Sequence, residues 1–155
     1  MTQTPRQSMT RKARQAAARY AVAPDVATFG AIGGSTVAEA IAVEAGLPLS
    51  ALDELEESGI TRQEIHALVI PPRTLAHRRS KGETLSTEEG ERVVRLGHVL
   101  RAANRVFGDR EKALVYLREP KARFHGRPPL LMARTESGGR AVEELLIQIE
   151  EGYFA

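Results

Sequence analysis

The run LSTEEGERVVRLGHVLRAANRVFGDREKALVYLREP, residues 85–120, constrains the fold of this chain more than any other stretch. Ser86 and Glu89 have the spacing of a capping box, so a long helix is predicted to begin there and to end at Gly108. Apolar residues recur along it at spacings of three and four, which places them in two neighbouring stripes. A helix that is apolar on two sides contacts more than one neighbour, inside the chain or in a second copy. The stripes are Val93, Leu96, Leu100, Ala103 and Phe107, and beside them Val99, Ala102 and Val106.

Shorter helices are predicted on both sides of this one. Ser35 or Thr36 begins a helix that runs through Ala45, within which Val37 and Ile41 recur four residues apart. No stretch alternates apolar and polar residues over a useful length, so the predicted fold class is all-α. The remaining helices are expected to begin at Ser50 (paired with Asp53 and running to 58), Thr61 (paired with Glu64), Pro72 (running to about Arg79), Asp109, Pro128-Pro129 and Thr135.

Composition limits the class of protein. A chain of 155 residues can form one domain, or two small ones sharing a core, and it has no cysteine for disulfides. No apolar run approaches the ~18 residues of a membrane span, and the N-terminus lacks a signal-peptide core, which predicts a cytoplasmic protein without membrane contact. The four histidines lack metal-ligand spacing, and GAIGGS at 30–35 lacks the flanks of a phosphate loop. We therefore expect no metal, no cofactor and no enzyme activity.

Charge is segregated along the chain although its formal net charge is only +2. Residues 1–20 carry five bases and no acid, residues 21–57 seven acids and no base, and residues 58–81 five bases and one acid. A local basic block in a nearly neutral chain is typical of a surface for an anionic partner, although such a block can equally be a solvated face.

The third block also has the layout of a helix-turn-helix. The helix that begins at Thr61 must stop before Pro71, and Pro72 suits the first position of a second helix. Leu75 falls on the buried side of that helix and the opposite side is basic, which is the pattern of a DNA-recognition helix. Val69 stands where the turn commonly has a glycine, so we expect a non-standard turn.

Three stretches together resemble the Xre/MbcA/ParS antitoxin family over roughly residues 47–155: ALDELEESGITRQEIHALVIPPRTLAHRRSKGETLSTEEGERVVRLGHVL, FGDREKALVYLREP and GRPPLLMARTESGGRAVEELLIQIEEGYFA. The resemblance implies an Xre-like helix-turn-helix in the N-terminal half and a helical toxin-binding domain in the C-terminal half. It implies neutralisation of a RES-domain toxin, which consumes NAD or transfers ADP-ribose from it, by covering the entrance to the toxin's active site. It also implies repression of the chain's own operon, and a homodimer within a larger toxin–antitoxin complex on an operator with a two-fold repeat.

The resemblance assigns parts of the chain to these roles. The expected parts are a DNA-binding domain, 35–86; a connecting and dimerisation helix, 87–107; and a toxin-binding domain, 108–155, while the composition of residues 1–34 indicates a basic arm and linker. Candidate DNA contacts are Arg62, Arg73, Thr74, His77, Arg78, Arg79 and Lys81. Candidate toxin contacts are Arg127, Arg140, Glu144, Gln148, Glu151, Gly152, Tyr153, Phe154 and Ala155. Candidate dimer contacts are Val93, Leu96, Leu100 and Phe107.

Some alternatives stay open. The chain is either such an antitoxin or a stand-alone dimeric helix-turn-helix transcriptional regulator whose C-terminal half only dimerises. The aromatic pair Tyr153-Phe154 either anchors a partner or folds back onto the core. The five bases of the arm either add phosphate contacts or stay disordered.

Overall fold

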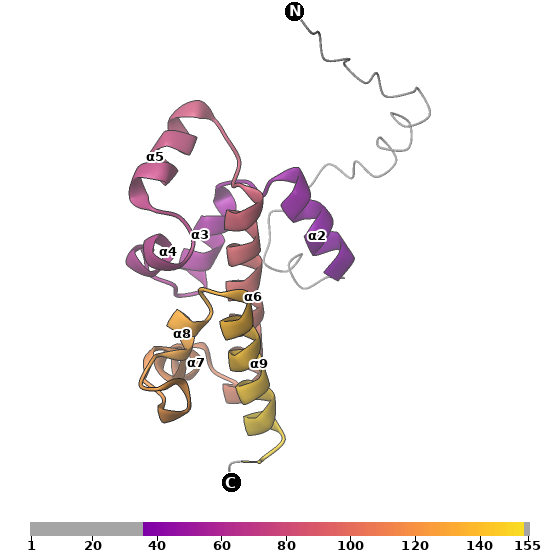
Figure 1. Cartoon of the computed structure of the whole chain (residues 1–155), viewed down its shortest axis with the longest axis vertical. Helices are drawn as coiled ribbons and strands as arrows, with labels where there is room; N and C mark the ends of the chain where they lie inside the picture. Colours follow the sequence, from indigo (N-terminus) through magenta and orange to yellow (C-terminus); the bar gives the residue numbers. More distant parts are fainter. Residues whose placement is uncertain (1–35, 154–155) are drawn as a thin grey trace, which may run out of the picture.

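The computed structural model describes residues 36–153, which form helices and no strand (Figure 1). This confirms the all-α prediction. The predictions for the arm, for Ser35 and the GAIGGS segment, and for Phe154 and Ala155 lie outside the described residues. The elements are α2 (Thr36–Ala45), α3 (Ser50–Glu57), α4 (Arg62–Leu68), α5 (Pro72–Lys81), α6 (Thr87–Phe107), α7 (Arg110–Arg118), the 3-10 turn η1 (Ala122–Phe124), α8 (Pro129–Met132) and α9 (Glu136–Glu150).

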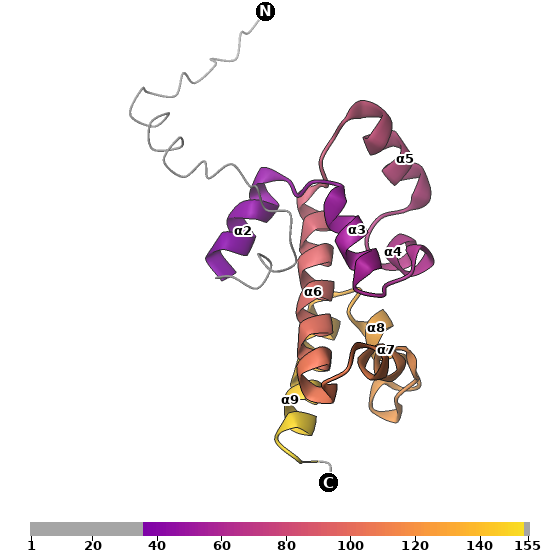
Figure 2. The ribbon, with the colours of Figure 1, turned by 180° about the vertical axis from the view of Figure 1, so that it is seen from behind.

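The long helix α6 is the axis around which the other helices are arranged (Figures 1 and 2). The helices α3, α4 and α5 lie toward its N-terminal end, α7 and α8 lie toward its C-terminal end, and α9 runs beside its second half. One continuous apolar core joins both ends, from Leu52 and Leu55 to Leu117 and Leu146. Within residues 36–153, no helix has both the length and the apolarity to cross a membrane.

The apolar stripes of α6 are buried in this core. Val93, Leu96 and Leu100 are 0%, 1% and 4% exposed, and the Phe107 ring is half-buried with its centroid 4.7 Å from that of Tyr116. The burial of Val93, Leu96 and Leu100 contradicts their interpretation as dimer contacts, whereas that of Phe107 stays a prediction. Their side chains pack inside one chain, so Val93, Leu96 and Leu100 offer no surface to a second copy in this fold.

Side-chain caps begin α4, α6, α7 and α9, as the sequence predicts. In α4, the Thr61 hydroxyl accepts from the Glu64 backbone N–H at 3.2 Å, and the Glu64 carboxylate accepts from the Thr61 N–H at 2.7 Å. Ser86 and Glu89 form the same reciprocal box at the start of α6. These paired bonds satisfy N–H groups that a helix start leaves without partners, which fixes the first residue of each helix.

The capping box predicted for Ser50 is wrong. Ser50 is already helical, the N-cap is Leu49, and no side chain caps the helix there. The backbone begins to turn one residue earlier, since the Ala51 N–H donates to the Pro48 carbonyl at 3.1 Å. Asp53 is therefore one residue too far into the helix to serve in a cap.

The predicted apolar stripe of α2 also lies on the wrong side. Val37 and Ile41 are 66% and 46% exposed, whereas Val43 and the carboxylate-bearing Glu39 are 2% and 7% exposed. The recurrence predicts the helix correctly, but it marks the outer face. The spacing of apolar residues cannot predict which face of a helix is buried when that face carries an acid such as Glu39.

The turn between α4 and α5 needs no glycine, in agreement with the non-standard turn expected at Val69. Val69 has φ −115°, outside the left-handed region, so its branched side chain is not strained. Val69 and Ile70 are 1% and 0% exposed, and Arg92 of α6 donates to the Val69 carbonyl at 2.9 Å. The turn is therefore fixed by burial and by α6.

Candidate functional site

The outer side of α5 is a basic surface. Arg73, His77 and Lys81 are exposed and follow one another four residues apart, so they form one stripe on the side away from buried Leu75. No acid occurs in α5, and no carboxylate of residues 36–153 pairs with Arg73, Arg79 or Lys81. Thr74 is half-buried beside the stripe, and Arg79 is exposed nearer to Leu75. We call Arg73, His77 and Lys81 the recognition stripe.

Two predicted DNA contacts are held by carboxylates of the chain itself. Arg62, at the start of α4, donates to both oxygens of Glu56 at 3.1 and 3.3 Å. Arg78 pairs with Glu83 at 3.2 Å and with Glu89 at 2.9 Å, and its side chain is only 20% exposed. The structure therefore separates these two arginines from the recognition stripe, a distinction that the sequence pattern did not reveal.

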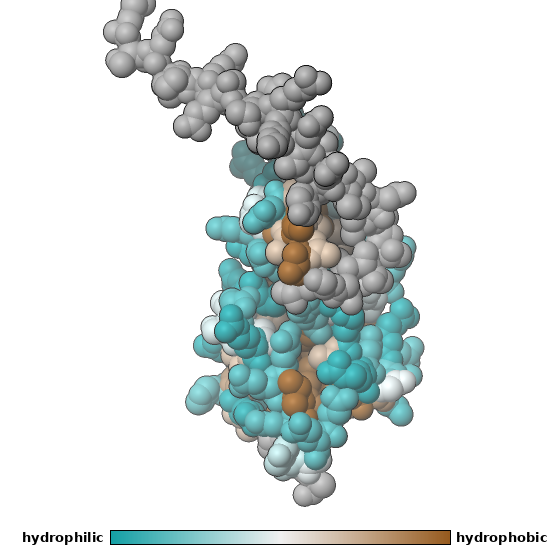
Figure 3. All heavy atoms as spheres, turned by 90° about the vertical axis from the view of Figure 1, so that its right-hand side faces the viewer, coloured by the Kyte–Doolittle hydropathy of each residue, from teal (hydrophilic) through white to brown (hydrophobic). Residues whose placement is uncertain are grey.

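The C-terminal end of α9 carries a second surface. Glu144, Ile147, Gln148, Glu151 and Tyr153 line one shallow, open depression. Ile147 is 44% and Tyr153 is 75% exposed, so an apolar centre has charged and polar groups around it. We call these five residues the α9 groove. On the face in Figure 3, apolar residues likewise form small patches surrounded by hydrophilic ones.

The structure brings only some of the predicted toxin contacts together. Glu144, Gln148, Glu151 and Tyr153 share the α9 groove, and Gly152 follows α9 with the positive φ of 78° typical after a helix end. Arg140 lies on the first half of α9, where it pairs with Glu136 at 3.1 Å.

Arg127 lies apart from the α9 groove, and Ile147 of the groove was not among the predicted toxin contacts. Arg127 is exposed in the separate turn that closes on Lys121, since the Lys121 N–H donates to its carbonyl at 3.2 Å. Ile147 was missed from the sequence, because it was assigned to no role.

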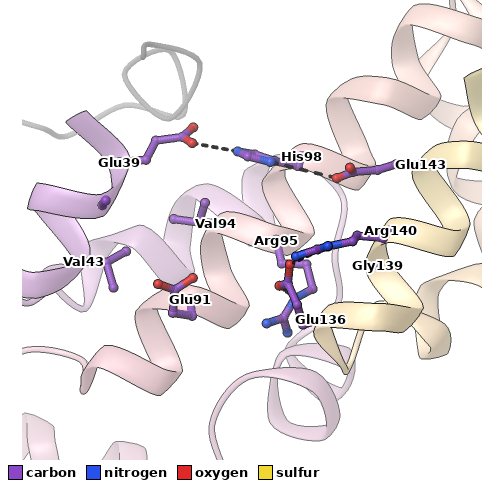
Figure 4. A pocket seen from close by; sticks show the side chains of 11 residues that line it. Glu39, Val43, Glu91, Val94, Arg95, His98, Glu136, Gly139, Arg140 and Glu143 are labelled. Atoms are coloured by element: carbon purple, nitrogen blue, oxygen red, sulfur yellow. Dashed lines mark hydrogen bonds and ion pairs between the residues drawn. The ribbon is translucent and has the colours of Figure 1, made fainter. Parts of the chain in front are cut away.

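A cavity of about 290 Å³ lies between α2, α6 and α9 (Figure 4). Glu39 of α2 accepts from His98 Nε2 at 2.8 Å and from Arg101 at 3.4 Å, while Glu143 of α9 lies 3.9 Å from His98 Nδ1. These contacts explain how α2 can bury a carboxylate. The described residues contain no group of histidine and acidic side chains able to hold a metal ion.

An ion pair joins the two halves that carry the two surfaces. Arg118 of α7 donates to both oxygens of Glu64 at 2.7 and 2.9 Å, and to the Gly59 carbonyl at 2.8 Å. Partial burial opposes ionisation of Glu64, but the hydrogen bonds from Arg118 and Thr61 outweigh it and hold the pKa of the Glu64 carboxyl below its usual value. The first helix of the helix-turn-helix is thereby fastened to the C-terminal half.

Comparison with known proteins places both surfaces in recognised domains. The antitoxin Xre-like helix-turn-helix domain matches residues 39–97, which include α5, and the antitoxin Xre/MbcA/ParS C-terminal toxin-binding domain matches residues 102–152, which include α9. The chain is 38% identical over 108 residues to a Pseudomonas putida protein named antitoxin Xre, covering 70% of this chain and 68% of that protein. It is 31% identical over 116 residues to the antitoxin Xre of Yersinia enterocolitica, covering 73% and 78% of the two chains.

The Glu64–Arg118 pair makes stability depend on pH. Because the pKa of Glu64 is lower in the folded than in the unfolded chain, its contribution is complete above the unfolded value of about 4.3 and is lost as the pH falls through the folded value. The variant Glu64→Gln keeps a capping oxygen but loses the charge. We expect it to lower the free energy of unfolding by about 1 kcal/mol at pH 7, and by less at pH 4, in urea titrations.

Glu119→Gln is the matched control, because Glu119 pairs with Lys121 at a mostly exposed position. Glu119→Gln should change the free energy of unfolding little at either pH. A Glu64→Gln effect that stays the same at pH 7 and pH 4 would contradict the role of the Glu64 charge.

Proposed function

Because the chain belongs to the Xre/MbcA/ParS antitoxin family, we propose that it neutralises a RES-domain toxin by covering the entrance to the toxin's active site. The toxin is an enzyme that consumes NAD or transfers ADP-ribose from it. The α9 groove is the observation that carries this proposal. It lies in the half of the chain that matches the toxin-binding domain and ends in an exposed aromatic residue.

The α9 groove has the composition of a protein-binding surface. Exposed aromatic and aliphatic side chains supply binding energy when a partner excludes water from them, and a polar rim supplies orientation. Ile147 and Tyr153 are the candidate anchors, and Glu144, Gln148 and Glu151 form the rim. Gln148 is already oriented by a hydrogen bond of 2.8 Å from Arg123, so part of the rim is ordered before binding. Phe154 and Ala155, which follow directly in the sequence, are proposed to continue the contact, and Arg127 and Arg140 are proposed as further toxin contacts outside the groove.

DNA binding is the second part of the proposal. The helix-turn-helix domain would place α5 in the major groove of the operator, with the recognition stripe toward the bases and phosphates and Thr74 and Arg79 beside it. A homodimer would read a two-fold repeat with half-sites one or more helical turns apart, and occupancy would repress the chain's own operon. The boundaries 35–86, 87–107 and 108–155 are proposed as the corresponding parts.

The toxin, and not this chain, would carry out the enzymatic reaction. We propose that the chain itself catalyses nothing, needs no cofactor, and acts in the cytoplasm, where its NAD-consuming partner would find its substrate.

Replacing an anchor of the α9 groove tests the toxin-binding proposal. We expect Ile147→Asp and Tyr153→Ala each to weaken inhibition of the purified toxin's NAD consumption by about 30-fold, since an interface anchor contributes about 2 kcal/mol or more. Val115→Asp is the matched control, because Val115 is 57% exposed on α7 and lies outside the groove. Unchanged inhibition by both variants, or an equal loss with Val115→Asp, would contradict the placement of the toxin at the groove.

Salt dependence tests the recognition stripe. We expect Arg73→Ala with Lys81→Ala to weaken binding to the duplex upstream of the chain's gene and to reduce the slope of log K against log salt by about 2, one for each lost phosphate contact. Arg134→Ala is the control, because Arg134 is exposed in the loop before α9. If the control changes the slope as much as the double variant does, binding reflects the net charge and not α5.

A further inference from the structure

The side chain of Glu89 contacts two parts of the molecule at once. It is 7% exposed, and its Oε2 accepts the Ser86 backbone N–H at 2.8 Å as part of the cap of α6. The same carboxylate faces Arg78 of α5, eleven residues earlier. Arg78 Nη2 donates to Oε1 at 3.3 Å, and Nε lies 2.9 Å from Oε2, a close ion-pair contact whose geometry falls short of a hydrogen bond.

The helix α5 has few other attachments to the body of the molecule. Leu75 is its only buried side chain, at 7% exposure. The segment after it is fastened by Leu85, whose backbone N–H donates to the Leu47 carbonyl at 2.8 Å. Figures 1 and 2 show α5 at the margin of the molecule, joined to α6 by a connecting segment. One apolar contact can hold a helix against its neighbours, but it does not fix the rotation of that helix about its own axis.

We propose that Arg78 and Glu89 are positioning residues for DNA recognition: their ion pair fixes the rotation of α5 so that the recognition stripe faces the DNA, and Arg78 itself does not touch the DNA. This inference rests on the proposed DNA binding. It replaces the expectation from the sequence, in which Arg78 was one of the DNA contacts.

The electrostatics around Arg78 support this role. Its guanidinium lies between two carboxylates, Glu89 and Glu83, so one positive charge faces two negative ones. A phosphate approaching this group would meet a net negative charge, which disfavours a direct contact. Arg73 and Lys81, in contrast, have no carboxylate partner among residues 36–153.

Three single variants distinguish a positioning role of Arg78 and Glu89 from a direct contact of Arg78 with DNA and from an effect on the stability of the fold. Glu89→Gln retains a carbonyl oxygen that can complete the capping box with Ser86, but it removes the negative charge that faces Arg78 and replaces one acceptor oxygen by an amide group that donates. Arg78→Met keeps the apolar stem and removes the guanidinium. Ser86→Ala weakens the same cap of α6 without touching the ion pair.

The full chain and its variants are titrated with two duplexes at several salt concentrations, at a temperature where circular dichroism shows all of them folded. One duplex comes from upstream of the chain's gene, and the other has the same composition in scrambled order. We expect Glu89→Gln and Arg78→Met each to weaken binding to the upstream duplex at least tenfold, and the double variant to be no weaker than the poorer single one. Binding of both variants to the scrambled duplex should stay within twofold of wild type, and their salt slope should equal that of wild type. Ser86→Ala should bind both duplexes as wild type does.

Each other outcome overturns the inference in a recognisable way. If Arg78→Met lowers the salt slope by about 1 and weakens both duplexes equally, Arg78 is a phosphate contact. If Glu89→Gln binds as wild type does, the pair positions nothing, and if Ser86→Ala loses as much as Glu89→Gln, the loss comes from the cap of α6. A wild-type chain that does not prefer the upstream duplex would instead remove the proposed DNA recognition itself.

Discussion

Burial of α6 on more than one side is the constraint on which the rest of the structure depends. A helix capped by Ser86 and Glu89 and ended by Gly108 presents apolar residues to two directions, and both must be covered. The helices α2, α3, α7 and α9 all contact α6 and cover its apolar residues. As a result, α5 and the end of α9 are held toward opposite ends of one rod (Figure 1). This separation suits a molecule that is proposed to hold DNA at one end and a toxin at the other.

Charged groups, and not apolar burial, set the finer arrangement of the parts. Arg118 joins α7 to the capping box of α4, Arg92 holds the turn at Val69, and Arg78 joins α5 to the cap of α6. Each of these arginines meets a group that already completes a helix end or a turn. Because breaking a partly buried pair leaves one charge without a partner, such contacts tie the orientation of one helix to the integrity of another. Arginines without a carboxylate partner among residues 36–153, such as Arg73, are then available for a partner.

Local rules predicted the helices because their causes are local. A capping box spans four residues and a proline acts on its neighbour, so Thr61, Ser86 and Pro72 could be placed from the sequence alone. The same rules could not say which side of α2 faces inward, since Glu39 is buried only because His98 and Arg101 are supplied from 59 and 62 residues away. For the same reason Val93, Leu96 and Leu100 were predicted to face a second copy although they are buried in the core of one chain, and the ion pair of Arg78 with Glu89 could not be predicted. The two surfaces could be predicted as regions, but the roles of single side chains depend on tertiary contacts.

The most direct test of the central claim is a tagged pull-down from the native host, comparing the full chain with a chain cut after Glu151. We expect a small enzyme to co-purify with the full chain, and to be lost, or to consume NAD freely, when the residues after Glu151 are missing. If both chains bring down only DNA and a second copy of themselves, the C-terminal half is a dimerisation module and the antitoxin mechanism proposed here is contradicted.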